Sequence, residues 1–249
     1  MQVARLHPDP AIVDLETELS GLDLAARAPS ERPYLVLNMV STADGKATIE
    51  GRTRKLGGEA DTLLFKQLRT QADAVMAGAE TVRVERYGPI VKDEASRQKR
   101  RDEGLEADPL AVIVSGSLAL PTDLPLLLEP QARVVIATTS SEEIPSAEAQ
   151  VDYVRAPGPS LGLPDVMRRL RTDHGVRSIL CEGGPTLNDG LLREGLVDEL
   201  FLTVTPLVRG GGDPLTIVAG RPLPEPAPLE LVSALHHESE LCLRYRVAS

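Results

Sequence analysis

The feature that most constrains the fold is a series of short apolar segments that alternates with helical patterns. The apolar segments are rich in β-branched residues and span 34–40, 74–77, 110–115, 133–138, 151–154, 177–181, 199–205 and 241–247. Leucines at helical spacing lie between several of them, over 59–70, 163–171 and 186–193. Strands that alternate with helices favour an α/β protein, with a mostly parallel sheet covered by helices on both faces.

The two ends of the chain depart from this alternation. Ile12, Leu15, Leu19, Leu22 and Leu24 form a loose helical stripe that stops before Pro29. We therefore expect a helical leader over 1–30 and a single domain over 31–249. Near the other end, a Pro- and Gly-rich connection over 210–228 separates two strand candidates without a helix, which predicts an antiparallel edge.

Composition excludes several classes of partner. The chain has no Trp, and its 27 basic residues are outnumbered by 37 acidic ones, for a net charge of −10. Such a surface repels nucleic acids and anionic membranes, and few aromatic residues are available to stack on bases. The charged stretch 92–108 mixes both signs and is interpreted as a surface excursion.

Cysteine, histidine and hydropathy patterns narrow the possibilities further. Cys181 and Cys242 do not form a CxxC pair, and the four histidines lack zinc-ligand spacing, so neither a disulfide framework nor a metal site is predicted. Neither a signal peptide nor an 18-residue apolar run is present, so we expect a cytoplasmic protein.

The strongest candidate motif is Glu182-Gly183-Gly184-Pro185-Thr186-Leu187, where a strand leads into two glycines and a helix. Glycines let a backbone approach a ligand closely, and the free N–H groups of a helix start favour phosphate. Glu182 stands at the carboxyl end of the strand, where open α/β sheets place ligands. A plain strand-to-helix turn is the alternative interpretation.

A second polar set follows the strand 34–40 and comprises Asn38, Ser41, Asp44 and Lys46. Asp44 and Lys46 are two residues apart and can contact an anionic or polyhydroxy ligand. An Asp-Gly turn with an exposed lysine fits the same spacing equally well.

Two further strands end in glycine. Gly78 precedes a helix start at which Thr81 can cap the helix or contact phosphate, and Arg83 and Arg86 add local positive charge. Gly211 lies in a run of three glycines that suits either a substrate contact or a flexible turn. One shared ligand cleft explains these strand ends better than several independent turns.

Other motifs fail. The segment 44–48 lacks the first glycine and the final Ser or Thr of a P-loop, and the chain contains no GxGxxG. The GxSxG match around Ser160 lies in a proline-rich connector, which makes a serine hydrolase a remote alternative.

Together, S-x-x-D-G-K at 41–46, G-x-x-T-V at 78–82, E-G-G-P-T-L at 182–187 and V-D-E-L at 197–200 resemble the riboflavin-biosynthesis reductases. This is the RibD C-terminal domain family, which has a three-layer dihydrofolate-reductase-like fold. The resemblance covers about 33–246.

The resemblance implies an NADPH-dependent reductase of a ribosylaminopyrimidine 5′-phosphate, which transfers hydride to C1′ of the ribose and gives a ribitylamino product. It implies catalytic roles for Asp44 and Glu182 and a homodimer. It assigns substrate contacts to Asn38, Ser41, Lys46, Arg86 and Gly211. It assigns NADPH contacts to Gly78, Thr81, Glu85, Ser115, Gly116, Gly183, Gly184, Pro185, Thr186 and Leu187.

The sequence departs from the family in two places. Fused members carry a zinc deaminase domain where this chain has a short leader, so no deaminase activity is expected. Fused members tend to have T-V-x-x-D-D-P where this chain has Thr81 to Tyr87 with Glu85, Arg86 and Tyr87 at the last three positions. A dihydrofolate or pteridine reductase is therefore the alternative function, and a non-catalytic nucleotide-binding module is a remote one.

Overall fold

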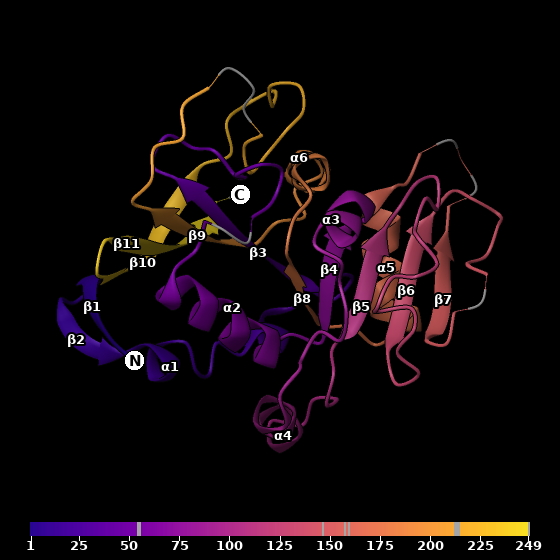
Figure 1. The fold of residues 1–249 in the computed structure, drawn as a ribbon, viewed down its shortest axis with the longest axis horizontal. Helices are drawn as coiled ribbons and strands as arrows, with labels where there is room; N and C mark the ends of the chain where they lie inside the picture. Colours follow the sequence, from indigo (N-terminus) through magenta and orange to yellow (C-terminus); the bar gives the residue numbers. More distant parts are fainter. Residues whose placement is uncertain (54–55, 146, 157, 159, 212–214, 249) are drawn as a thin grey trace. The chain divides into compact units, whose positions relative to one another are not determined.

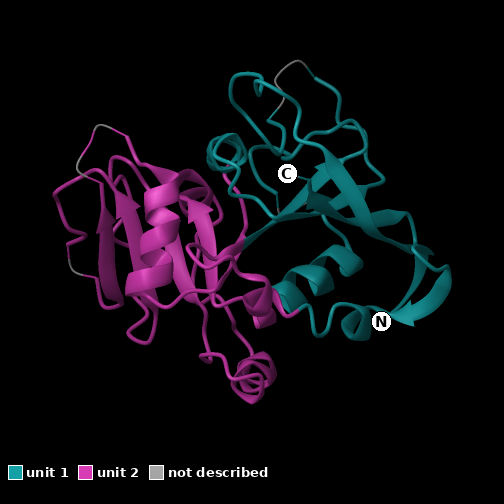
Figure 2. Ribbon diagram, turned by 180° about the vertical axis from the view of Figure 1, so that it is seen from behind, with its two compact units in different colours: residues 1–22, 35–68, 185–249 teal, residues 23–34, 69–184 magenta. Residues whose placement is uncertain are grey.

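The computed structural model describes residues 1–53, 56–145, 147–156, 158, 160–211 and 215–248. The chain divides into two compact units (Figure 2). Unit 1 comprises 1–22, 35–68 and 185–249, and unit 2 comprises 23–34 and 69–184. The predicted single domain beginning at residue 31 stays a prediction, whereas residues 1–22 belong to the same unit as the C-terminal strands.

Unit 1 is built on a mixed sheet (Figure 1). Its strands are β1 (Gln2–His7), β2 (Ala11–Asp14), β3 (Tyr34–Thr42), β9 (Glu199–Thr205), β10 (Leu229–His237) and β11 (Glu240–Val247). They follow the order β2-β1-β10-β11-β9-β3, in which only β9 and β3 run parallel. The helices α1 (Leu15–Glu18) and α6 (Pro185–Arg193) also belong to this unit, and α2 (Glu59–Gln71) begins here and ends in unit 2.

Unit 2 contains a parallel sheet. Its strands are β4 (Ala74–Gly78), β5 (Leu110–Val114), β6 (Arg133–Thr138), β7 (Gln150–Arg155) and β8 (Ser178–Cys181), in the order β8-β4-β5-β6-β7. Its helices are η1 (Leu24–Arg27), α3 (Ala79–Val84), α4 (Glu94–Asp102) and α5 (Leu163–Asp173). In the opposite views of Figures 1 and 2, α3 and α5 lie on opposite faces of these strands. The predicted α/β class, with a mostly parallel mixed sheet, is confirmed.

The helical leader predicted over 1–30 is wrong. Residues 2–14 form a β-hairpin, and β1 pairs antiparallel with β10. The Pro8-Asp9-Pro10 turn is the signal for this hairpin, and the leucine stripe describes only α1 and η1. Asp14 caps α1 by accepting a hydrogen bond from the Thr17 N–H. The antiparallel edge is therefore built by both ends of the chain.

The charged stretch 92–108 lies mostly at the surface, as predicted, with one exception. Arg100 in α4 is completely buried, and its guanidinium donates to the carbonyls of Glu106, Arg69 and Ala72. The last two carbonyls lie at the C-terminal end of α2, where a cation satisfies unpaired carbonyls and complements the helix dipole. Burial lowers the pKa of Arg100 to about 10.

Replacing Arg100 with methionine is expected to lower the free energy of unfolding by about 3 kcal/mol, because three carbonyls lose a buried charged donor. The melting temperature should fall by about 6–12 °C. Arg101→Met removes an exposed pair with Glu94 and should change stability by less than about 0.5 kcal/mol. Equal melting temperatures for the two variants would contradict the capping role. Circular dichroism melts measure both.

Candidate active site

The segment that follows β3 is an Asp-Gly turn. The Gly45 N–H donates to the Thr42 carbonyl at 2.9 Å, and Gly45 has a φ of +79°, which glycine adopts without strain. The Lys46 N–H donates to the Thr42 hydroxyl at 2.9 Å. The Asp-Gly turn predicted as the alternative is thus correct for the backbone. This turn fixes the positions of Asp44 and Lys46 in unit 1.

Asp44 holds a second segment in place. Its carboxylate accepts hydrogen bonds from the Thr42 hydroxyl at 2.5 Å and from the N–H groups of Arg209 and Gly210 at 3.1 and 2.8 Å. These bonds, that from the Thr42 hydroxyl above all, lower the pKa of Asp44 to about 2. Asp44 therefore carries no proton near neutral pH. As an acceptor it holds Arg209 and Gly210, the two residues before Gly211, against the turn after β3.

The hydrogen bonds to Asp44 make a prediction about pH. Because its pKa falls from 3.8 to about 2 on folding, the carboxylate stabilises the folded state above about pH 4, and this contribution is lost as the pH falls toward 2. NMR titration of the side-chain carboxyl should give a midpoint near 2. Asp44→Ala should speed amide exchange at Arg209 and Gly210 by about tenfold. A midpoint near 4 would show that these bonds do not persist in solution.

Asn38 lies on β3 and is only 9% exposed. Its Oδ1 accepts no hydrogen bond from any residue that the structure describes. Native proteins rarely leave a buried acceptor unpaired, so such an atom points to a missing partner. Ser41, near the end of the same strand, is buried, and Lys46 is half-buried. Gly211 is exposed with a φ of +87°, whereas the neighbouring 212–214 lie outside the described residues.

Unit 2 brings two of the predicted glycine loops together. The Gly78 N–H donates to the Gly183 carbonyl at 2.9 Å, and Gly183 and Gly184 have φ values of +100° and +101°. A Cβ at Gly184 would lie 3.4 Å from the Gly78 Cα and 3.5 Å from the Thr81 Oγ1. Both loops are thus bare backbone that suits an anionic group.

Glu182 directly follows β8 and belongs to a buried cluster. Both of its carboxylate oxygens accept from the Arg69 guanidinium, at 2.6 and 2.7 Å, and Oε2 also accepts from the Tyr87 hydroxyl at 2.6 Å. The Glu182 side chain is 2% exposed. Motif spacing missed Arg69, which lies in the last turn of α2. Tyr87 falls within the segment where the sequence departs from the family that it resembles.

The cations after Gly78 have acidic partners. Arg83 pairs with Glu80, and Arg86 pairs with Asp123 at 3.1 Å while donating to the Asp123 carbonyl. Arg86 has a φ of +51°, so the chain turns sharply there. Glu85 caps the end of α3 through its N–H, which donates to the Thr81 carbonyl. A substrate contact by Arg86 stays a prediction, and it requires competition with Asp123.

The remaining predicted cofactor residues follow β5 or lie in the first turn of α6. Ser115 is buried, and the Gly116 carbonyl accepts from the hydroxyls of Thr138 and Thr139. Pro185 is the first residue of α6, which suits its fixed φ, and Leu187 is buried. Thr186 is exposed in the same first turn.

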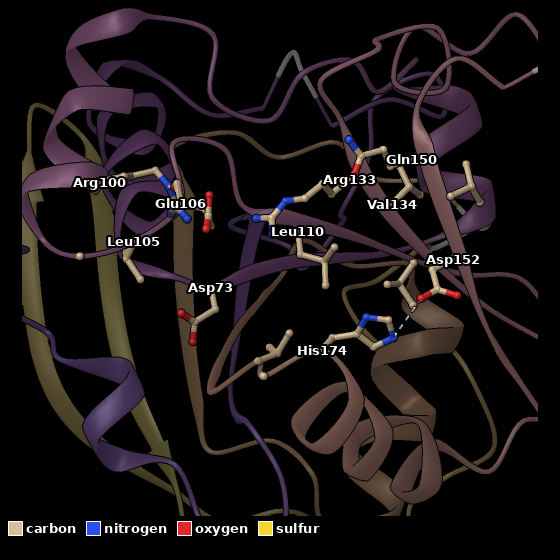
Figure 3. Close-up of a pocket in the computed structure, with 15 residues that line it drawn as sticks. Asp73, Arg100, Leu105, Glu106, Leu110, Arg133, Val134, Gln150, Asp152 and His174 are labelled. Carbon is tan, nitrogen blue, oxygen red and sulfur yellow. Dashed lines mark hydrogen bonds and ion pairs between the residues drawn. The ribbon is translucent and has the colours of Figure 1, made fainter.

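A separate pocket of about 600 Å³ lies at the amino-terminal ends of the unit 2 strands (Figure 3). The pocket is lined by charged side chains, among them Arg133, Glu106, Asp73 and the pair His174–Asp152. Within the part of the chain that the structure describes, none of the predicted site residues borders this pocket. It therefore stands apart from the glycine loops, which follow the carboxyl ends of β4 and β8.

The parallel strands of unit 2 and the mixed strands of unit 1 form an α/β protein with a dihydrofolate-reductase-like fold. A solved pyrimidine reductase-like protein from Corynebacterium diphtheriae has a similar fold, with a TM-score of 0.79 at 24% identity over 95% of this chain and 100% of that one.

The chain belongs to the RibD C-terminal domain family, whose model matches residues 33–243. A 2,5-diamino-6-ribosylamino-4(3H)-pyrimidinone 5′-phosphate reductase from Archaeoglobus fulgidus is 31% identical over 76% of this chain and 87% of its own length. The protein of that name from Methanothermobacter thermautotrophicus is 30% identical over 87% of this chain and 99% of its own. The predicted family and enzyme class are confirmed.

No helix among the described residues is long and apolar enough to cross a membrane.

Proposed function

We propose that the chain reduces 2,5-diamino-6-ribosylamino-4(3H)-pyrimidinone 5′-phosphate, the substrate named for its relatives, with NADPH as the reductant. Hydride reaches C1′ of the ribose in its open-chain imine form, a proton joins the nitrogen, and the ribitylamino product results. The close approach of Gly184 to Gly78 carries the proposal, because it forms a bare-backbone cradle of the kind that suits a pyrophosphate.

The residues of the chain fit such a cofactor. Gly78, Gly183 and Gly184 place backbone without side chains next to Thr81 and the start of α3. When bound, NADPH supplies the hydride from C4 of its nicotinamide. The protein then has to orient the acceptor carbon and exclude water.

The proton for the nitrogen is assigned to Lys46. Asp44 is ionised at neutral pH because its pKa is about 2, and both oxygens of Glu182 already accept hydrogen bonds from Arg69, so both carboxylates act as acceptors. Lys46, predicted to contact substrate, has an ammonium group with three N–H donors. Its ammonium forms no hydrogen bond or ion pair with any of the residues described.

The test is NADPH oxidation, followed at 340 nm, with the diamino substrate, its deaminated counterpart and dihydrofolate. Turnover of the diamino substrate with a higher kcat/KM than either competitor supports the proposal. Dihydrofolate as the preferred substrate would replace it with the pteridine alternative. Tight NADPH binding without turnover of any of them would indicate a binding module.

Lys46→Met should retain NADPH binding and lose turnover. NADH in place of NADPH tests the preference for the 2′-phosphate.

The homodimer and the cytoplasmic location stay predictions. Sedimentation equilibrium tests the former and cell fractionation the latter.

A further inference from the structure

Three side chains that cluster at the end of β8 connect distant segments of unit 2. Arg69 comes from the end of α2, Tyr87 from the segment after α3, and Glu182 from the residue before the Gly183-Gly184 loop. Arg69 also donates to the Ile90 carbonyl at 2.7 Å, and its guanidinium lies 5.9 Å from the Tyr87 ring. We call these three residues the Glu182 cluster.

The hydrogen bonds of the Glu182 cluster hold the Glu182 carboxylate in a fixed position and orientation. A guanidinium that forks onto both oxygens of a carboxylate fixes its plane as well as its position. The Tyr87 hydroxyl adds a third donor, and burial, followed by the Glu182 charge, raises the pKa of Tyr87 well above its usual range. Tyr87 therefore keeps its proton near neutral pH and donates to Glu182.

Within the Glu182 cluster, Glu182 itself directly precedes the Gly183-Gly184 loop in the chain. The Glu182 N–H donates to the Met76 carbonyl at 2.8 Å, and the Gly183 carbonyl accepts from Gly78. The backbone on either side of Glu182 is therefore tied to β4, while its side chain is tied to Arg69 and Tyr87. Gly183 and Gly184 contribute no side chains of their own to hold the loop, so its position depends on these ties.

We propose that Arg69 and Tyr87 are positioning residues of the reductase, which act through Glu182 to hold the Gly183-Gly184 loop in its ligand-binding conformation. This inference rests on the proposed function. Neither residue needs to contact substrate, and Glu182 serves as the link between them and the loop.

The test variant is Tyr87→Phe, which removes one hydroxyl and keeps the ring, the ion pair and the fold. We expect amide exchange at Gly183 and Gly184 to become about tenfold faster without NADPH, the dissociation constant of NADPH to rise about fivefold, and kcat to fall about tenfold. KM for the pyrimidine should stay within twofold. Arg69→Lys keeps the charge but loses the fork, and it should give larger changes in the same direction.

Tyr153→Phe is the matched control, because the Tyr153 hydroxyl accepts from the Ile144 N–H elsewhere in unit 2. It should leave exchange at Gly183 and Gly184 and kcat unchanged. Unchanged exchange in Tyr87→Phe, or faster exchange with wild-type kcat and NADPH affinity, would overturn the inference. Failure of the proposed function is distinguishable from either result, because the wild-type protein would then bind NADPH without reducing any substrate in the panel.

Discussion

Gly184→Ala is expected to lower kcat/KM for NADPH by roughly 100-fold, which corresponds to about 2.7 kcal/mol of lost binding in the transition state. The first reason is the backbone, because at a φ of +101° any residue with a Cβ is strained. The second is space, because the new methyl group would lie 3.4 Å from the Gly78 Cα and 3.5 Å from its nitrogen. At these distances the methyl group is in van der Waals contact with Gly78 and covers the bare backbone that suits a phosphate.

Gly175→Ala separates these two effects. Gly175 also has a positive φ, of +68°, but a Cβ there meets no atom within 4 Å. It should cost about 1 kcal/mol of stability through strain and leave kcat/KM for NADPH within twofold. Steady-state kinetics with varied NADPH measures both variants. Equal losses in the two would show that the close approach of Gly184 to Gly78 has no part in cofactor binding.

The parallel part of the fold could be predicted because its strands are buried on both faces. β4, β5 and β8 are continuous apolar segments with helical patterns between them, and local sequence suffices to identify them. The glycine loops could be predicted for a similar reason, since each directly follows such a strand.

The antiparallel strands depend on tertiary pairing instead. β10 was missed because its hairpin with β11 turns at Glu238-Ser239, without the Asn-Gly or Asp-Gly pair that usually marks a two-residue turn. Glu238 has a φ of +51° there, a conformation that its residue type does not predict. β1 pairs with β10, which is more than 200 residues away in sequence, so only the turn that joins β1 to β2 carries a local signal.

The site was predicted in part. Motif spacing located the glycine loops and Glu182. It could not show that the Glu182 carboxylate accepts hydrogen bonds from Arg69 and Tyr87, because those residues are distant from it in sequence. Nor could it show that the pKa of Asp44 is lowered, since that follows first from the Thr42 hydroxyl and then from the N–H groups of Arg209 and Gly210. Tyr87 and Arg86 lie where the sequence departs from the pattern of fused family members. One departure supplies a donor to Glu182 and the other pairs with Asp123, so this segment is where we expect specificity to differ.

Asn38→Leu is expected to make the protein more stable and less active. An unpaired buried acceptor costs about 1–3 kcal/mol, and leucine has a similar shape without the polar atoms. The free energy of unfolding should therefore rise by about 1 kcal/mol and the melting temperature by about 2–4 °C. If the Asn38 Oδ1 accepts a hydrogen bond from substrate, kcat/KM for the pyrimidine should fall by about 50-fold, with NADPH affinity unchanged.

Asn188→Leu is the matched control, because Asn188 is also a buried asparagine of unit 1 but donates to the Ile217 carbonyl at 2.7 Å. The same substitution there should lower the free energy of unfolding by about 1–3 kcal/mol, so the two variants should shift the melting temperature in opposite directions. If Asn38→Leu were less stable than the wild type, Oδ1 would have a partner in the free protein. If it were more stable and fully active, the unpaired acceptor would have no role in binding substrate. A gain in stability with a loss of turnover is the result that places Asn38 in the site, because only a ligand absent from the free protein would then satisfy its oxygen.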